Sequence, residues 1–116
     1  MFDLESHLAR QIAFSRATFG PGERREGVAD HIEKELKGEI LQDGLTPYAA
    51  AEEWVDVVIL ALDGMTRALI AAGEPWEEVP GLAVAMICEK QATNEQRDWP
   101  DWRTADPGKA IEHIGE

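Results

Sequence analysis

Residues 46–73 have the sequence TPYAAAEEWVDVVILALDGMTRALIAAG, the most informative stretch of this chain for its architecture. Thr46 followed by Pro47 is typical of a helix start, and Gly73 is typical of a helix end. Eight of the nine residues 54–62 are apolar. A helix that is apolar all round is buried all round, so we expect this one to lie inside a bundle or against a partner chain.

Three further helices are predicted around this one. Apolar residues at four-residue spacing predict helices over about residues 3–18 and 26–42, and over a segment that starts at Trp76 or Pro80 and ends at Arg97. Glycine and proline separate these segments, and no repeat or β-type alternation is found. Four helices with short connections indicate an all-α fold, a four-helix bundle of roughly antiparallel neighbours. With 116 residues, we expect a single domain over 1–116.

The composition excludes several classes of protein. The formal net charge of -12 disfavours nucleic-acid binding, and no apolar run approaches the roughly 20 residues that a membrane span needs. The N-terminal residues do not resemble a signal peptide. Cys88, the only cysteine, ends the apolar run LAVAMIC, so we expect it in the core of a cytoplasmic protein.

Two acidic residues lie in the predicted buried helix. Asp56 has apolar neighbours on both sides, and burying a carboxylate costs several kcal/mol unless a metal or cation meets it. Glu53 lies one turn earlier, so both carboxylates can point into one space. The pattern therefore favours a site for a cation.

The helix predicted over residues 26–42 offers a second pair of acids. Glu39 falls within the apolar arc of this helix and Glu35 at its border, whereas Glu33 points largely away. Two acids from each of two adjacent helices make a pocket that suits hard cations with oxygen ligands. Glu35 and Glu39 taken alone are more simply interpreted as a solvated face, and Asp56 is what favours the metal site.

Several segments of the chain resemble one known family. They are FGPGER at 19–24, DHI at 30–32, KEL at 34–36, EEWVDVVILALDG at 52–64, EKQA at 89–92, NE at 94–95 and WPDWRT at 99–104. They are similar to the phage-associated (MazZ-like) dATP/dGTP pyrophosphohydrolases of the MazG and dimeric dUTPase superfamily of all-α enzymes. The resemblance covers nearly the whole chain.

The resemblance implies a reaction and a set of ligands. It implies hydrolysis of a purine deoxynucleoside triphosphate to the monophosphate and pyrophosphate, with two or three Mg²⁺ ions that Mn²⁺ can replace. The family signature is E-x-x-E followed by E-x-x-D, which assigns metal binding and catalysis to Glu35, Glu39, Glu53 and Asp56. One departure stands out: the third residue after Glu35 is Gly38, and the next acid is Glu39. Three- and four-residue spacings share a helix face, and Gly38 is a place for a local bulge.

The last predicted helix supplies candidates for substrate binding. Its apolar line continues towards the C-terminus as basic and polar residues, which either line an anion site or are solvated. The resemblance favours substrate contacts, and the set is Lys90, Asn94, Arg97, Trp99 and Trp102. The two tryptophans would stack on a base, close over the site, or pin the C-terminal tail.

Three alternatives remain open on the sequence alone. A non-catalytic helical interaction module would leave the acids as surface charge. A di-iron bundle is disfavoured because no Glu lies three residues before a histidine. A dUTP- or dCTP-type enzyme shares the metal signature. The resemblance further implies a homodimer or homotetramer, located in the host cytoplasm if a phage encodes it. His31 is interpreted as structural, and Asp63 and Arg67 as a buried ion pair or a partner contact.

Overall fold

The computed structural model describes residues 2–115, which fold into helices and connecting loops. No β-strand is present in this part of the chain, apart from one isolated bridge between Asp98 and Ile114. The prediction of an all-α fold with four α-helices is confirmed. The elements are α1 (Leu4–Phe19), α2 (Arg25–Glu35), the π-helical turn η1 (Leu36–Ile40), α3 (Pro47–Ala71), α4 (Val79–Gln96) and the 3₁₀ turn η2 (Trp102–Thr104).

The helix ends follow the local chemistry of the sequence. Asp3 accepts a hydrogen bond from Ser6 N at 3.4 Å and caps α1, which ends at Gly20 with φ 88°. Thr46 Oγ1 accepts a hydrogen bond from Ala49 N at 3.2 Å at the start of α3, with proline in the first turn. These side chains and the left-handed glycine satisfy backbone groups that a helix leaves open at its ends.

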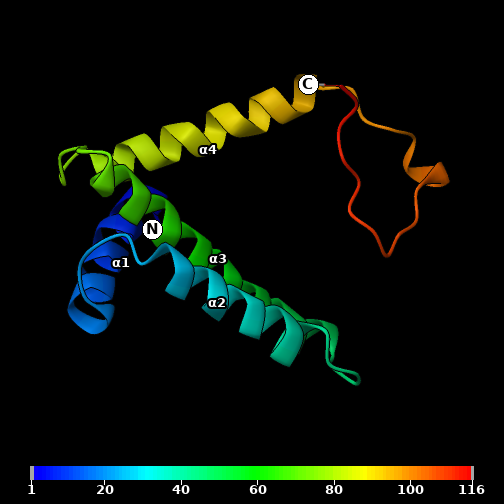
Figure 1. Ribbon diagram of the computed structural model, residues 1–116, viewed down its shortest axis with the longest axis horizontal. Helices are drawn as coiled ribbons and strands as arrows, with labels where there is room; N and C mark the ends of the chain where they lie inside the picture. Colours follow the sequence, from blue (N-terminus) through cyan, green and yellow to red (C-terminus); the bar gives the residue numbers. More distant parts are fainter. Residues whose placement is uncertain (1, 116) are drawn as a thin grey trace. The chain divides into compact units, whose positions relative to one another are not determined.

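The chain packs as two units, Met1–Val84 and Ala85–Glu116. In the first unit α2 runs antiparallel along α3, and α1 packs against α3 (Figure 1). Gln11 on α1 donates a 2.6 Å hydrogen bond to the carbonyl oxygen of Ile59 on α3. The buried apolar residues of this unit are Leu8, Ile12, Val28, Val79 and Ala83.

A buried ion pair ties the loop between α1 and α2 to α3. Arg67 Nε lies 3.0 Å from Asp63 Oδ2, and both residues are buried. The Arg67 guanidinium also donates to the carbonyl oxygens of Gly20 and Gly22 at 2.9 and 2.7 Å, and to Ser15 Oγ at 2.8 Å. The prediction of a buried ion pair is confirmed, and Arg67 anchors the loop that leads into α2.

Two predictions of burial were wrong for the single chain. Val55 and Val58 on α3 are more than half exposed, because α1 and α2 cover only part of the circumference of this helix. Cys88 is exposed, as is every residue of α4 from Ala85 to Thr93. None of the helices among residues 2–115 is both long and apolar enough to cross a bilayer.

Candidate active site

The first acid of the site lies at the C-terminal end of α2. Glu35 is the last residue of this helix, and its side chain is 18% exposed. Its Oε1 lies 3.7 Å from His31 Nε2, one turn earlier, whereas its Oε2 is buried and has no hydrogen-bond partner within residues 2–115. An unpaired buried carboxylate oxygen is unfavourable. This oxygen therefore indicates a site for a cation.

Directly after Glu35 the helix changes its winding. Residues Leu36–Ile40 form a π-helical turn, closed by a 2.9 Å hydrogen bond from Leu41 N to the carbonyl oxygen five residues earlier. A π turn holds one residue more than an α turn, and such turns are frequent at functional sites. Glu39 lies within this turn and is exposed. The bulge predicted at Gly38 is confirmed.

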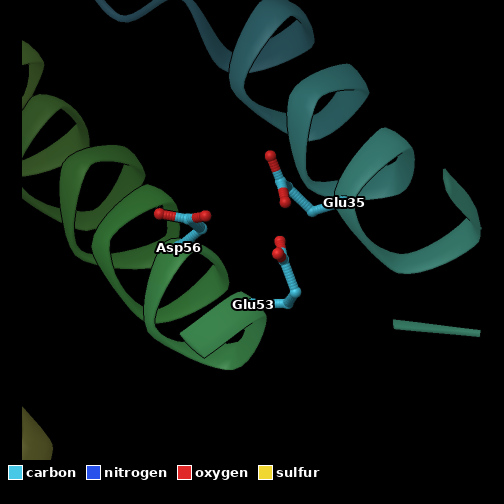
Figure 2. Close-up of side chains that lie close together, drawn as sticks. All are labelled: Glu35, Glu53 and Asp56. Atoms are coloured by element: carbon cyan, nitrogen blue, oxygen red, sulfur yellow. The ribbon is translucent and has the colours of Figure 1, made fainter. Parts of the chain in front are cut away.

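Two further acids extend from α3 towards Glu35. Glu53 and Asp56 lie one turn apart on α3, on the side of the helix that faces the end of α2 (Figure 2). Glu35, Glu53 and Asp56 each offer one carboxylate oxygen, and these three oxygens all lie within 4.8 Å of one another. The structure thus brings together three of the four acids that the sequence predicts as ligands.

Nearby negative charges change the pKa of Glu53. The pKa of the Glu53 carboxyl is raised above its ordinary value, first by desolvation and then by the negative charges of Glu39, Glu35 and Asp56. Glu39 acts on Glu53 through its charge, but it is exposed and lies outside the group of three carboxylate oxygens that meet. Like charges at this spacing repel one another, and a bound cation relieves that repulsion.

The expected burial of Asp56 was wrong. Asp56 is exposed, whereas Glu35 and Glu53 are half-buried. The reason is the same partial coverage of α3 that leaves Val55 and Val58 exposed. One side of the carboxylate cluster therefore faces solvent, which gives a substrate access to it.

The remaining acid of α2 lies outside the cluster. Glu33 Oε1 is 2.6 Å from Lys37 Nζ, and this pair is well exposed. Glu33 therefore belongs to the solvated face of α2, as its angular position in the sequence predicts. Carboxylate oxygens from two helices, one of them without a partner, are the donor set that Mg²⁺ and Mn²⁺ prefer. The residues present fit a divalent metal centre.

Comparison with known proteins identifies the enzyme class. Residues 8–116 match the family described as dATP/dGTP pyrophosphohydrolase. The chain belongs to the dATP/dGTP pyrophosphohydrolase family. It is a hydrolase that acts on nucleoside triphosphates, so the resemblance inferred from the sequence segments is confirmed. No curated protein and no solved structure matches the chain.

The predicted substrate-binding residues lie in the second unit. Lys90 is exposed on α4, and Arg97 donates a 3.2 Å hydrogen bond to Asn94 Oδ1. Trp99 Nε1 donates to the carbonyl oxygen of Asn94 at 2.7 Å. Trp102 is 71% exposed. The Trp99 ring also lies edge-on to the His113 ring, 5.8 Å between centroids, which ties the C-terminal segment to the end of α4. Contact of this set with substrate stays a prediction.

A small pocket lies between α2 and α3, next to the carboxylate cluster. Its volume is about 90 Å³, and it is lined by Phe19, Arg24, Gly27, Val28, His31, Leu60 and Asp63. His31 joins the two sites, because it lines the pocket and also approaches Glu35. In the sequence, residues 19–24 carry part of the family resemblance but do not by themselves predict a pocket. The signal that points to a pocket is the step of three or four residues from Arg24 through Gly27 and His31 to Glu35, which keeps these residues on one face of α2.

Proposed function

We propose that this chain hydrolyses dGTP, dATP or both to the monophosphate and pyrophosphate in a magnesium-dependent reaction. Membership in the dATP/dGTP pyrophosphohydrolase family supports the substrate class. The observation that carries the metal dependence is the buried, unpartnered Oε2 of Glu35 beside the carboxylates of Glu53 and Asp56. A triphosphate is itself an anion and is repelled by the four carboxylates. It binds next to them only when metal ions lie between its phosphates and the carboxylates.

We assign the metal ligands to the four acids of α2, η1 and α3. Glu35, Glu53 and Asp56 form the cluster, and the π turn supports Glu39 as the fourth ligand. Two or three Mg²⁺ ions, or Mn²⁺ in their place, fit this number of carboxylates. Bound metal supplies neutralisation of the triphosphate charge and activation of a water molecule for in-line attack on the α-phosphorus.

The other roles belong to side chains of the protein. Glu35 is the acid that we assign as the proton acceptor of the attacking water, through the carboxylate oxygen that does not bind metal. Lys90 and Arg97 contact the phosphates in this proposal, with Asn94 orienting Arg97 through the hydrogen bond between them. Trp99 and Trp102 stack on the base or close over the bound nucleotide. No nucleophilic serine or cysteine is required.

The test is a panel of deoxynucleoside triphosphates, incubated with and without magnesium and scored for monophosphate and pyrophosphate. We expect Glu53→Gln and Asp56→Asn each to lower kcat/KM by more than about 100-fold. Mutating residues that only hydrogen-bond to metal ligands already lowers metal affinity or activity by about 10–100-fold, so loss of a ligand itself should cost more. Glu52→Gln and Glu33→Gln are the matched controls, since these acids neighbour the site on the same two helices but are exposed and outside the cluster.

The outcomes separate the alternatives. Near-normal turnover in Glu53→Gln or Asp56→Asn contradicts the metal assignment. Preferential hydrolysis of dUTP or dCTP supports the pyrimidine-specific alternative. A protein with no turnover, and with a thermal stability that magnesium does not change, is the non-catalytic interaction module.

The exposed apolar face of α3 supports self-association. Val55, Val58 and Ile59 are exposed on α3, and Phe14 on α1 lines a hollow of about 280 Å³ together with Ile59. Together they make an apolar surface that spans two helices, and such surfaces mark interaction sites. We propose that a second copy of the chain covers it, in a homodimer or homotetramer. Analytical ultracentrifugation of Val58→Glu tests this, with the monomer as the expected product.

The family match extends over both units of the chain, from residue 8 to residue 116. We therefore propose that residues 1–116 act as a single pyrophosphohydrolase domain, and that it works in the cytoplasm. The net charge of -12 gives no support for nucleic-acid binding, and the described helices give none for a membrane span, so we propose no partner of either kind.

A further inference from the structure

The pocket next to the carboxylate cluster holds an arginine in an unusual position. Arg24 has φ 46° and ψ 33°, a left-handed backbone conformation that is unfavourable for residues with a Cβ. It begins α2 but makes no side-chain capping hydrogen bond. Non-glycine residues in such conformations gather at ligand sites, where the surrounding structure holds them.

Two neighbours define where the Arg24 guanidinium lies. Its Cζ is 5.6 Å from the centroid of the Phe19 ring. A Cβ added to Gly27 would lie 2.9 Å from Arg24 Nη2, so the guanidinium rests over the bare backbone of the first turn of α2. Within residues 2–115 no acidic side chain forms an ion pair with Arg24. Its donors are therefore available to a ligand.

The pocket lies at a suitable separation from the metal site for part of a nucleotide. Along α2, His31 is about 6 Å and Gly27 about 12 Å from Glu35, at 1.5 Å per residue. The antiparallel α3 supplies the opposite wall through Leu60 and Asp63, one and two turns beyond Asp56. A deoxyribose bridges such a separation between an α-phosphate at the carboxylates and a base in the pocket.

The lining of the pocket favours a base over a phosphate. Phe19, Val28 and Leu60 provide apolar contacts, and Asp63 places a carboxylate in the wall. Arg67 balances the charge of that carboxylate in the buried ion pair, so the apolar contacts decide the preference of the pocket. The volume of about 90 Å³ is the space of about three water molecules, which admits the edge of a planar ring but not a whole nucleotide.

We propose that this pocket receives the purine base of the substrate, and that Arg24 selects guanine by donating to its O6 and N7. Guanine presents two acceptors on this edge, whereas adenine presents one acceptor and one amino donor. The fork of a guanidinium fits the first pair and opposes the second. The inference rests on the proposed function, because it takes the nucleotide from the same reaction, and it assigns Arg24 as the specificity-determining residue.

The experiment compares Arg24→Met with Arg25→Met in the full-length protein with magnesium. Arg25 is the next residue along the chain and is exposed, but it does not line the pocket. We expect Arg24→Met to lower kcat/KM for dGTP about 10- to 100-fold. The same loss is expected for dITP, which shares O6 and N7 with dGTP, whereas kcat/KM for dATP stays within about 3-fold. Arg25→Met leaves all three values unchanged.

Gly27→Ala is a second variant that keeps the arginine and preserves the fold. The added methyl group displaces the flexible end of Arg24, and alanine favours the helix over glycine. We expect a loss of dGTP hydrolysis in the same direction but smaller, together with an unchanged or higher unfolding temperature. An equal loss for dGTP and dATP in Arg24→Met would mean that Arg24 contacts the phosphates, and unchanged values would mean that it contacts no substrate. Either result overturns the proposal.

Binding separates failure of this inference from failure of the proposed function. Isothermal titration with the α,β-imido analogues of dGTP and dATP measures recognition without hydrolysis. Tighter binding of the dGTP analogue, lost in Arg24→Met, supports the base pocket even if the protein proves not to hydrolyse dGTP. Turnover without any base-dependent effect of Arg24 retains the proposed function and overturns the pocket. Absence of binding by either analogue also overturns the pocket.

Discussion

Replacing Asp63 by asparagine tests whether the buried ion pair holds the loop before α2. The change keeps the size of the side chain but leaves the Arg67 guanidinium, 5% exposed, without its counter-charge. Breaking a buried pair by removing one partner costs about 3–5 kcal/mol. The lower end, about 3 kcal/mol, applies here because the amide oxygen still accepts one of the two Nε hydrogen bonds, at about 3 Å.

This cost is large against a total stability of about 5–15 kcal/mol. At about 4 °C per kcal/mol for a chain of this size, the unfolding temperature falls by about 12 °C. Circular dichroism during heating measures it, at one protein concentration, because association shifts apparent stability.

The matched control is Asp30→Asn on α2. Asp30 and Lys34 are also four residues apart and 3.6 Å from each other, but both are well exposed. Such pairs contribute about 0.3–0.5 kcal/mol, so the expected fall is about 2 °C or less. If Asp63→Asn destabilises the protein no more than Asp30→Asn does, the Arg67 cluster does not fix the start of α2. The double variant Asp63→Leu, Arg67→Met should recover most of the loss, since no buried charge then lacks its partner.

Two further predictions concern the carboxylate site. Deleting Gly38 turns the π turn into an α turn and places Glu39 three residues after Glu35, so we expect turnover within about 10-fold of the intact chain. Deleting Lys34 from the regular part of α2 rotates the acids beyond it by about 100° and should abolish turnover. If both deletions are equally inactive, the π turn has not placed Glu39. In the presence of a chelator, the unfolding temperature should fall as the pH rises from 4.5, because folding raises the pKa of Glu53 and the neutral carboxyl is the form that the fold tolerates. Glu53→Gln should flatten that dependence, and an unchanged slope would assign it to other groups.

Much of the helical architecture follows from local chemistry that the sequence displays. The cap and proline at residues 46–47 and the glycine at 73 bracket α3, and the observed helix Pro47–Ala71 agrees with them. The burial of that helix was less predictable. A nearly continuous apolar run indicates that much of the surface of the helix is apolar and favours burial. It does not indicate whether the same chain or another copy covers that surface. This is why Val55 and Asp56 were placed inside and are exposed.

The candidate site shows a similar division. The angular positions of Glu35, Glu53 and Asp56 predict that their carboxylates meet, and they do. The unpaired Oε2 of Glu35 and the position of Arg24 over Gly27 depend on how α2 packs on α3 and how the preceding loop enters it. Such features depend on tertiary contacts of the whole unit, so no spacing of residues in the sequence predicts them.

The π turn bears on the unusual four-residue spacing between Glu35 and Glu39. Metal ligands must converge in space, and convergence depends on the angle of each side chain about the helix axis rather than on the number of residues between them. One extra residue in a regular helix rotates all later side chains by about 100°. In the turn Leu36–Ile40 the wider winding takes up that rotation beside Gly38. Under the proposed assignment of Glu39 as the fourth ligand, an E-x-x-x-E sequence in this fold presents the same pair of carboxylates as E-x-x-E.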